Sequence, residues 1–303
     1  MLSKPADPAA AYWELTVTLG ADAAETSEAV TNRLWELGAV GVVEEAAAGV
    51  ATLRGFFPPG IDAAARAAAV REYLGELVAL DVPGAQARVE IAPLPDEPWA
   101  DAWRAHFRPV AVGRRLLVCP PWELPSHPGE RTVIIIEPGR AFGTGGHGST
   151  RSCLGLLERA LASGGVPRAV DVGCGSGILA IAAAALGVPR VDAIDPDPDA
   201  VAATEANARR NAVADRIRAA VAAVESWNGS AAPLVLANLL AAAHATLAPA
   251  LVGLVTPGGS LIAGGLLAHE VPVVAGVFAA EGCWLAEVAE DDGWAALLVR
   301  RGA

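Results

Sequence analysis

The first part of the chain, residues 11–92, alternates between short segments with β-type patterning and longer segments with helical patterning. Residues 11–20 have the pattern of a strand, and the segment behind them is helical because Val30, Leu34 and Leu37 fall on one helix face. Two short strands at 39–46 and 50–57, a second helix at 61–80 and a last strand at 86–94 follow. The order βαββαβ predicts a ferredoxin-like α+β domain.

From about Arg168 onwards, short apolar strands alternate with helical segments. The expected strands lie at 169–172, 190–195, 217–222, 233–238, 260–265, 283–290 and 294–300. Helical crossovers predict a mostly parallel sheet in an α/β domain, covered on both faces, with a ligand site at the carboxyl ends of the strands. The last two strands are joined by Asp291-Asp292-Gly293, a hairpin signal, so we expect a terminal antiparallel strand.

Three prolines within 93–98 mark a boundary between these two patterns. Behind them, Trp99, Trp103 and Phe107 share one face of an expected helix, a stripe that is more typical of packing than of ligand contact. Two further strand-like segments lie at 114–119 and 131–136. We therefore divide the chain into a ferredoxin-like domain at 1–92, a linker with a helix at 93–130, and an α/β domain at 131–303.

Composition limits the partners and the compartment. The 303 residues include 22 Lys and Arg against 34 Asp and Glu, and this net charge of −12 disfavours nucleic acid and suits a basic protein partner. The N-terminus lacks the apolar core of a secretory signal. The most apolar stretch, 233–255, is interrupted by Asn238, His244 and Pro249, which favours a buried strand and helix over a membrane span. We expect a cytoplasmic protein.

The cysteines and histidines do not have the spacing of metal ligands. The cysteines at 119, 153, 174 and 283 contain no CxxC pair, which suggests neither a zinc site nor a disulfide framework. His147 and His244 are possible bases, but a lone histidine in a loop or helix is more often neither base nor ligand.

Three glycines at alternate positions, Gly173, Gly175 and Gly177, separate an apolar strand from an apolar helix. Glycine lets the main chain turn sharply and expose bare N–H groups to a ligand, and the helix start suits an anionic group. Asp195 ends the next strand, 195 − 173 = 22 residues later, where an acid binds ribose hydroxyls in nucleotide-binding βαβ units. Ile178 replaces the third glycine of the dinucleotide fingerprint, which disfavours NAD and FAD. The alternative is an ordinary glycine turn.

Two other segments carry candidate chemistry. The loop 137–150 holds five glycines and enters a helix with Ser149 or Thr150 as the expected N-cap, which fits a ligand-covering loop and a surface linker equally. Asn238 ends a strand at the same sheet edge as the glycine turn, where its carboxamide can accept from an amine and donate to a cofactor. The alternative role for Asn238 is to cap the following helix.

Taken together, these motifs resemble one family, the PrmA methyltransferases, which methylate large-subunit ribosomal protein eleven. The resemblance covers nearly the whole chain and includes DxxWxxxWxxxF at 96–107, CysPro at 119–120, PGxAFGTGxH at 138–147, DVGCGSGILAIAA at 171–183 and VLANLLA at 235–241. It implies a class I methyltransferase, Rossmann-like fold and S-adenosylmethionine as cofactor. The positions that match the family's cofactor-binding motifs are Thr150, Asp171, Gly173, Gly175, Asp195 and Asn238.

The resemblance also implies the substrate and the reaction. The N-terminal domain would recognise the ribosomal protein, and the acceptors would be amines, either lysine side chains or the N-terminal α-amine. Methyl transfer to nitrogen chiefly needs a neutral amine held about 3 Å from the methyl carbon. We hypothesise that Asn238, or a main-chain carbonyl beside it, orients the amine lone pair and is the catalytic residue.

The chain departs from the family's pattern in three places. Gly146, Gly148 and Ser149 replace bulkier residues in the loop, Ala242 and Ala243 replace a GlyPro pair, and 291–294 replaces a GluGluTrp-like segment. These changes bear on substrate choice. The alternatives are a related protein-lysine methyltransferase with another target and a non-catalytic module that binds S-adenosylmethionine. An N-terminal domain favours the ribosomal substrate, because such lysine methyltransferases commonly lack it.

Overall fold

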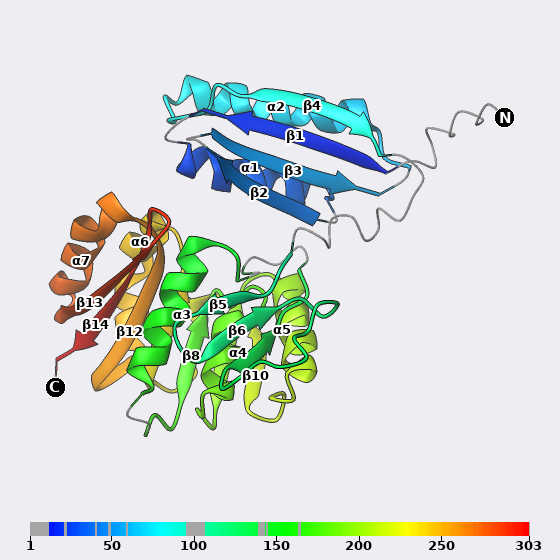
Figure 1. The fold of residues 1–303 in the computed structure, drawn as a ribbon. Helices are drawn as coiled ribbons and strands as arrows, with labels where there is room; N and C mark the ends of the chain where they lie inside the picture. Colours follow the sequence, from blue (N-terminus) through cyan, green and yellow to red (C-terminus); the bar gives the residue numbers. More distant parts are fainter. Residues whose placement is uncertain are drawn as a thin grey trace. The chain divides into compact units, whose positions relative to one another are not determined.

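The chain forms two compact units, residues 1–106 and 107–303, in a computed structural model (Figure 1). The structure describes residues 12–20, 23–39, 41–47, 50–58, 60–94, 107–138, 143, 145–162 and 165–302. Each unit has its own hydrophobic core. Trp99 and Trp103 of the expected aromatic stripe lie outside the described residues.

The N-terminal unit is a four-stranded antiparallel sheet with two helices. Its elements are β1 (Trp13–Leu19), α1 (Ala24–Glu36), β2 (Gly41–Ala47), β3 (Val50–Phe57), α2 (Ala63–Ala79) and β4 (Arg88–Pro93). The strand order is β2-β3-β1-β4, and Val30 and Leu34 of α1 share a buried core with Leu15 and Val17 of β1. The predicted βαββαβ, ferredoxin-like arrangement is confirmed.

The second unit contains a seven-stranded sheet in the order β10-β9-β8-β11-β12-β14-β13. Its strands are β8 (Ala169–Val172), β9 (Val191–Asp195), β10 (Ile217–Val221), β11 (Ala232–Asn238), β12 (Val255–Leu267), β13 (Cys283–Asp291) and β14 (Trp294–Arg301). The first five strands in that order are parallel, and β14 is antiparallel to both β12 and β13. The predicted class I methyltransferase sheet is therefore confirmed.

The sheet ends in an antiparallel pair, as predicted, with β13 at the edge and β14 between β13 and β12. The first six residues of β14 are all buried, as expected for a strand covered on both faces, whereas most of β13 is partly or fully exposed. The hairpin turn between them places Asp292 and Gly293 at φ values of 53° and 79°, the left-handed pair that a two-residue turn requires. After β12 the chain therefore forms the edge strand β13 first, and β14 then lies between β12 and β13.

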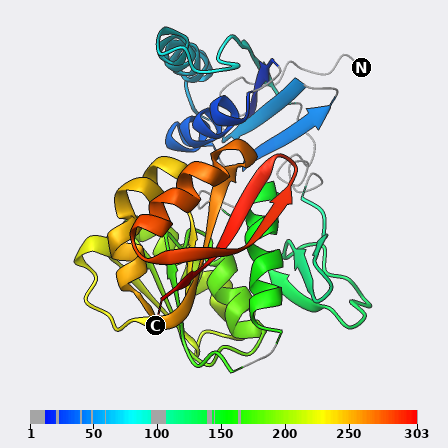
Figure 2. The ribbon, with the colours of Figure 1, turned by 90° about the vertical axis from the view of Figure 1, so that its left-hand side faces the viewer.

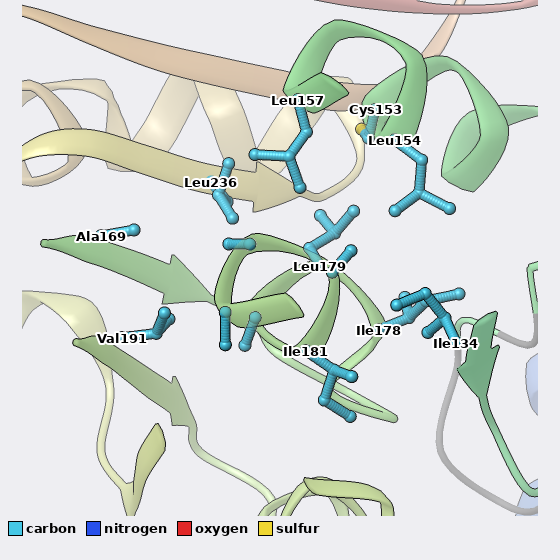
Figure 3. Close-up of a cluster of buried hydrophobic side chains, with 14 of the residues drawn as sticks. Ile134, Cys153, Leu154, Leu157, Ala169, Ile178, Leu179, Ile181, Val191 and Leu236 are labelled. Carbon is cyan, nitrogen blue, oxygen red and sulfur yellow. The ribbon is translucent and has the colours of Figure 1, made fainter. Parts of the chain in front are cut away.

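Helices cover both faces of this sheet (Figure 2). One face carries α3 (Gly148–Ala160), α4 (Ile178–Ala185) and α5 (Pro198–Arg210), and the other carries α6 (Ala241–Gly253) and α7 (Val271–Ala280). Short 3-10 segments, η2 (Val224–Ser226) and η3 (Ala268–Glu270), precede β11 and α7. On the first face, Leu157 of α3 and Leu179 of α4 pack over Leu236 of β11 (Figure 3). This core holds the first turns of α3 and α4 in place relative to the end of β11.

A small three-stranded sheet precedes α3 and belongs to the same unit. It consists of β5 (Val110–Val112), β6 (Leu116–Cys119) and β7 (Thr132–Ile135). Val112, Leu116 and Val118 are buried in the core that contains α3 and α4. Residues 107–130, which we assigned to the linker, therefore lie within the second compact unit. β5 was not predicted because three residues are too short for a recognisable pattern.

The apolar stretch 233–255 forms β11 and α6, a buried strand followed by a helix, as predicted. Within the described part of the chain, no helix is both long and apolar enough to cross a bilayer. The four cysteines are buried and free of disulfides.

Candidate functional site

The turn between β8 and α4 favours glycine at three positions. Gly173, Gly175 and Gly177 have φ values of 69°, 53° and 81°, in the left-handed region that side chains disfavour. A Cβ atom on Gly173 would lie 2.5 Å from Cδ2 of Leu239, and one on Gly177 would lie 2.8 Å from Oγ1 of Thr204. The main chain of the turn is thus in close contact with the segment after β11.

Asp195 lies at the end of β9, beside this turn. Its Oδ2 accepts a hydrogen bond from the main-chain N–H of Gly175 at 3.0 Å, and its Oδ1 accepts from that of Asp197 at 2.9 Å. The side chain is only half-buried, and each carboxylate oxygen keeps further lone-pair capacity. Asp195 is therefore held in one orientation by main-chain donors and still has acceptor capacity for hydroxyl groups.

Asp171 supports the turn from the interior. Its side chain is 1% exposed, and Oδ2 accepts from the main-chain N–H of Ala180 in the first turn of α4 at 2.9 Å. Burial raises the pKa of Asp171 to about 7, the Ala180 N–H opposes this, and the nearby Asp195 charge adds to it. The carboxylate thus fixes the start of α4.

The glycine-rich loop packs against the same turn. The Ser176 hydroxyl donates to the main-chain carbonyl of Gly143 at 2.6 Å, and both groups are buried. A Cβ atom on Gly145 would lie 2.5 Å from Cγ1 of Val118, so this part of the loop lies directly on the small sheet. Positions 139–142 and 144 are outside the described residues. The described part favours a loop that borders the site over a free surface linker.

The N-cap of α3 is His147, so the prediction of Ser149 or Thr150 was wrong. The main chain of His147 is extended, and its Nδ1 accepts from the main-chain N–H of Ser149 at 3.4 Å. Ser149 and Thr150 are buried inside the first helical turn. Burial and the nearby Arg151 charge lower the pKa of His147 to about 4, against a smaller opposing effect of Asp292, so the ring is neutral at pH 7.

Asn238 lies at the end of β11 and faces the first turn of α3. Its Nδ2 lies 3.4 Å from Oγ of Ser149 and 3.5 Å from Oγ1 of Thr150. Its Oδ1 is buried and accepts no hydrogen bond from any residue that the structure describes. The alternative role is not observed, because the N-cap of α6 is Leu240 rather than Asn238.

The fold brings the predicted residues together at one edge of the sheet. β8 lies between β9 and β11, so the glycine turn, Asp195 and Asn238 are neighbours, and the first turn of α3 adds Thr150. These residues would fit an adenosyl sulfonium, because Asp195 keeps acceptor capacity for ribose hydroxyls and the close-packed main chain of the turn leaves no room for side chains. His244 belongs to α6, where its Nε2 donates to the carbonyl of Gly264, the residue that pairs with Asn238 in the sheet, at 2.8 Å.

Two polar side chains on α5 were not predicted as part of this site. The Thr204 hydroxyl donates to the carbonyl of Gly175 at 3.0 Å, and the Asn207 Nδ2 donates to that of Ser176 at 2.9 Å. Both are buried and hold the turn from the side. No sequence signal distinguishes them from ordinary polar positions on a helix.

Comparison with known proteins gives a consistent result. The family model described as ribosomal protein L11 methyltransferase (PrmA) matches residues 11–302. The ribosomal protein L11 methyltransferase of Pelobacter propionicus is 34% identical over 311 residues, covering 96% of this chain and 98% of that protein. The ribosomal protein L11 methyltransferase of Trichlorobacter lovleyi is 45% identical over 213 residues, covering 67% of this chain and 68% of that protein.

A solved structure agrees. The crystal structure of ribosomal protein L11 methylase from Lactobacillus delbrueckii subsp. bulgaricus matches with a TM-score of 0.60 and 28% identity, covering 65% of this chain and 100% of that one. The resemblance that the motifs indicated is confirmed. The chain belongs to the PrmA family of ribosomal protein L11 methyltransferases, which use S-adenosylmethionine as cofactor.

Proposed function

We propose that this chain transfers methyl groups from S-adenosylmethionine to amines of ribosomal protein L11, on lysine side chains or on the N-terminal α-amine, and that Asn238 receives the amine. The observation that carries this proposal is the buried Oδ1 of Asn238, which has no partner among the described residues and lies at the strand end beside the glycine turn. An unpaired buried acceptor is costly, and a ligand donor would satisfy it.

Five positions would hold the cofactor, namely Thr150, Gly173, Gly175, Asp195 and Asn238. When bound, S-adenosylmethionine supplies an electrophilic methyl group on a sulfonium. Asp195 has acceptor capacity for hydroxyl groups, and Gly173 keeps side chains out of the turn. Asp171 would act indirectly, because its buried carboxylate holds the start of α4.

The acceptor amine must be neutral to react. A lysine amine with a pKa of ~10.4 loses its proton at pH 7 at a cost of roughly 4–5 kcal/mol, whereas an α-amine near ~7.8 requires about 1 kcal/mol. Desolvation near a sulfonium lowers the pKa of either amine. The chain therefore needs no dedicated base, and water takes the proton.

Asn238 is suited to orient that amine. Its NH₂ group faces the hydroxyls of Ser149 and Thr150, and Oδ1, which has no partner among the described residues, would accept an N–H from the substrate. An amine that donates one N–H to Oδ1 has its lone pair fixed in direction. Orientation of this kind is the main contribution that a protein can make to an in-line displacement.

The N-terminal unit would recognise ribosomal protein L11. The formal net charge of the whole chain is −12, which is complementary to a basic ribosomal protein. We place the reaction in the cytoplasm, because that is where a ribosomal protein is synthesised and assembled.

The role of Asn238 is tested by Asn238→Ala, assayed with L11 at a cofactor concentration shown by titration to be saturating. We expect kcat to fall at least about tenfold, a loss of roughly 1.4 kcal/mol of transition-state stabilisation. The exposed Asn228→Ala is the matched control and should leave kcat unchanged. Unchanged turnover in Asn238→Ala at saturating cofactor would rule the role out.

The substrate is tested separately. Radiolabelled S-adenosylmethionine is incubated with ribosomal proteins lacking this methylation, and with an extract depleted of ribosomes, and the labelled protein is identified by mass spectrometry. Label on L11 supports the proposal. Label only on a protein of the depleted extract would favour a methyltransferase with another target, and cofactor binding without any label would favour a non-catalytic module.

A further inference from the structure

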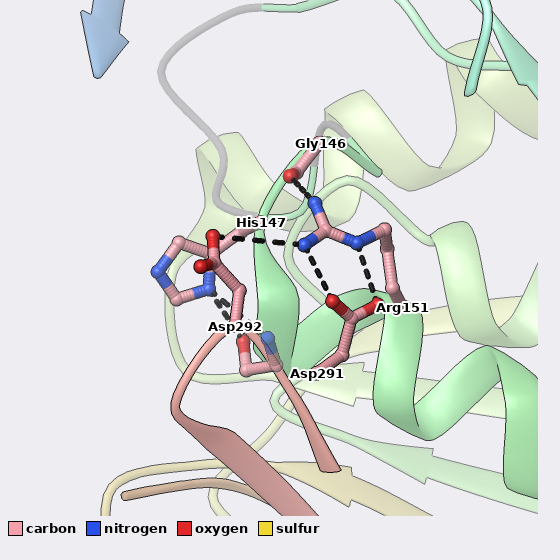
Figure 4. A network of polar contacts seen from close by, with 6 residues as sticks. Gly146, His147, Arg151, Asp291 and Asp292 are labelled. Atoms are coloured by element: carbon pink, nitrogen blue, oxygen red, sulfur yellow. Dashed lines mark hydrogen bonds and ion pairs between the residues drawn. The ribbon is translucent and has the colours of Figure 1, made fainter. Parts of the chain in front are cut away.

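Two segments that depart from the family's pattern lie against each other in the fold. Arg151, in the first turn of α3, forms a two-pronged ion pair with Asp291 at the end of β13, with Nε to Oδ2 and Nη2 to Oδ1 both at 2.8 Å (Figure 4). Its Nη1 donates to the main-chain carbonyl of Gly146, and Asp292 lies 3.8 Å from Nη2. One guanidinium therefore joins the glycine-rich loop, α3 and the β13–β14 hairpin.

The main chains of these segments are also in close contact. A Cβ atom on Gly148 would lie 2.5 Å from the carbonyl oxygen of Asp291 and 3.0 Å from Cδ1 of Trp294. The ring centroids of His147 and Trp294 are 4.5 Å apart. The hairpin turn thus packs directly on the N-cap and first turn of α3, where a side chain at 148 would separate them.

This contact lies next to the proposed cofactor site. Ser149 and Thr150 belong to the same helical turn as Arg151, and their hydroxyls face Asn238. A helical turn is rigid, so a shift of Arg151 also moves its two neighbours. The Arg151 side chain is 20% exposed and Asp291 is 40% exposed, so solvent screens the pair less than a fully exposed one.

We propose that Arg151 and Asp291 form a positioning pair that holds the first turn of α3 in the geometry required for S-adenosylmethionine binding. The β13–β14 hairpin, which contributes no residue to the proposed cofactor site, then sets the affinity of that site. Arg151 acts through Ser149 and Thr150. This inference rests on the proposed function, because it uses the proposed cofactor-binding role of Thr150.

The chain offers a matched control on the same two elements. Arg159 of α3 and Glu287 of β13 also form an ion pair, with 48% and 39% exposure. It lies eight residues along the helix from Arg151, about 12 Å away, and so is remote from the start of α3. Loss of either pair removes one α3–β13 contact, but only loss of the first affects the turn beside Asn238.

The test is calorimetric titration of the full chain with S-adenosylhomocysteine, together with the thermal midpoint of each variant. Arg151→Gln and Asp291→Asn should each raise Kd about five- to tenfold, whereas Arg159→Gln and Glu287→Gln should leave Kd within about twofold of the wild type. Asp291→Glu keeps the charge and should recover most of the affinity. If Arg151→Gln does not fold, the isosteric Asp291→Asn provides the measurement.

The outcomes separate the two proposals. Unchanged Kd in both Arg151→Gln and Asp291→Asn, or an equal rise in the control variants, would overturn the positioning pair while leaving the proposed function intact. A wild-type chain that binds no S-adenosylhomocysteine would overturn the proposed function and the positioning pair together.

Discussion

The hydroxyl of Ser176 donates to the main-chain carbonyl of Gly143 at 2.6 Å, and both groups are buried. Ser176 lies in the glycine turn after β8, and Gly143 lies in the glycine-rich loop before α3, so one hydrogen bond joins the two motifs on which the sequence comparison depends. A Cβ atom on Gly143 would lie 2.9 Å from the same hydroxyl, so the loop approaches this closely because it has no side chain there.

Ser176→Ala should loosen this contact. It leaves the buried Gly143 carbonyl without its donor, which destabilises the second unit by about 1–3 kcal/mol. We also expect weaker binding of S-adenosylhomocysteine, because the loop borders the proposed site. Urea unfolding and calorimetric titration measure the two effects. Ser226→Ala removes a hydroxyl-to-carbonyl bond at an exposed position and should change stability by less than about 0.5 kcal/mol; equal losses in both variants would contradict the assignment.

Gly173→Ala should damage the turn itself. The φ of 69° disfavours any side chain, and the added Cβ would meet Leu239 at 2.5 Å, so either the turn or the segment after Asn238 must move. We expect a loss of about 2 kcal/mol in stability and at least about tenfold weaker binding of S-adenosylhomocysteine. The control is Gly253→Ala at the end of α6, where the new Cβ would enter open space and alanine should be neutral or slightly stabilising. Binding retained in Gly173→Ala would show that the turn tolerates the shift.

The sequence predicts the main features of the site where local geometry demands a residue type. Gly173 and Gly175 occupy left-handed positions that only glycine adopts readily, and Asp195 ends a strand whose neighbour is fixed by parallel topology. The place of Asn238 at the end of β11 follows in the same way, whereas its proposed role comes from the family resemblance. In each case the residue's position follows from one strand end.

Other features depend on packing between distant segments, and the sequence does not reveal them. Arg151 and Asp291 are 140 residues apart, and the hairpin signal that contains Asp291 does not indicate which residue it pairs with. His147 caps α3 although serine and threonine are the usual cap residues, because the helix begins one residue after it and buries both hydroxyl groups. The internal place of β14 follows from its continuous burial, which a two-strand hairpin signal does not specify.

Asp171→Asn should change how the stability of α4 depends on pH. The pKa of Asp171 is raised to about 7, so between its usual value and pH 7 the folded chain holds a proton that the unfolded chain has lost, and wild-type stability falls as pH rises through this window. Asparagine keeps an acceptor for the Ala180 N–H but does not titrate. Hydrogen exchange of α4 amides measures the free energy of opening of this helix. The difference in that free energy, Asp171→Asn minus wild type, should therefore increase by more than about 1 kcal/mol from pH 4 to pH 8.

The matched control is Asp215→Asn, which removes a carboxylate at an exposed position and should leave the pH dependence of α4 stability as in the wild type. A difference between Asp171→Asn and the wild type that stays constant across this range would mean that Asp171 is ionised throughout, in which case main-chain donors outweigh its burial.

His147→Asn should remove a pH dependence of stability that is opposite in sign to that of Asp171. The pKa of His147 is lowered to about 4 from an ordinary value of 6.5, chiefly by burial and then by Arg151. Between these values the unfolded chain is protonated and the folded chain is not, so stability falls as pH drops from about 6.5 to 4, by up to about 3 kcal/mol. Protonation also removes the acceptor at the N-cap and places a positive charge at a helix start, which is unfavourable.

Asp171 and His147 change the stability of the folded chain in opposite directions over nearly the same pH range. The pH profile of wild-type stability therefore shows only the difference between their two contributions. Asparagine at 147 retains a cap acceptor and cannot titrate, so the gap between His147→Asn and the wild type isolates the histidine. Below about pH 6.5, we expect the α3 amides of the wild type to be less protected from hydrogen exchange than those of His147→Asn. The wild type should also bind S-adenosylhomocysteine with a higher Kd than the variant in this range. If the two proteins instead stay parallel down to pH 4, the imidazole is not buried in the neutral form, and the contact between the hairpin and the start of α3 is looser than the ring packing on Trp294 indicates.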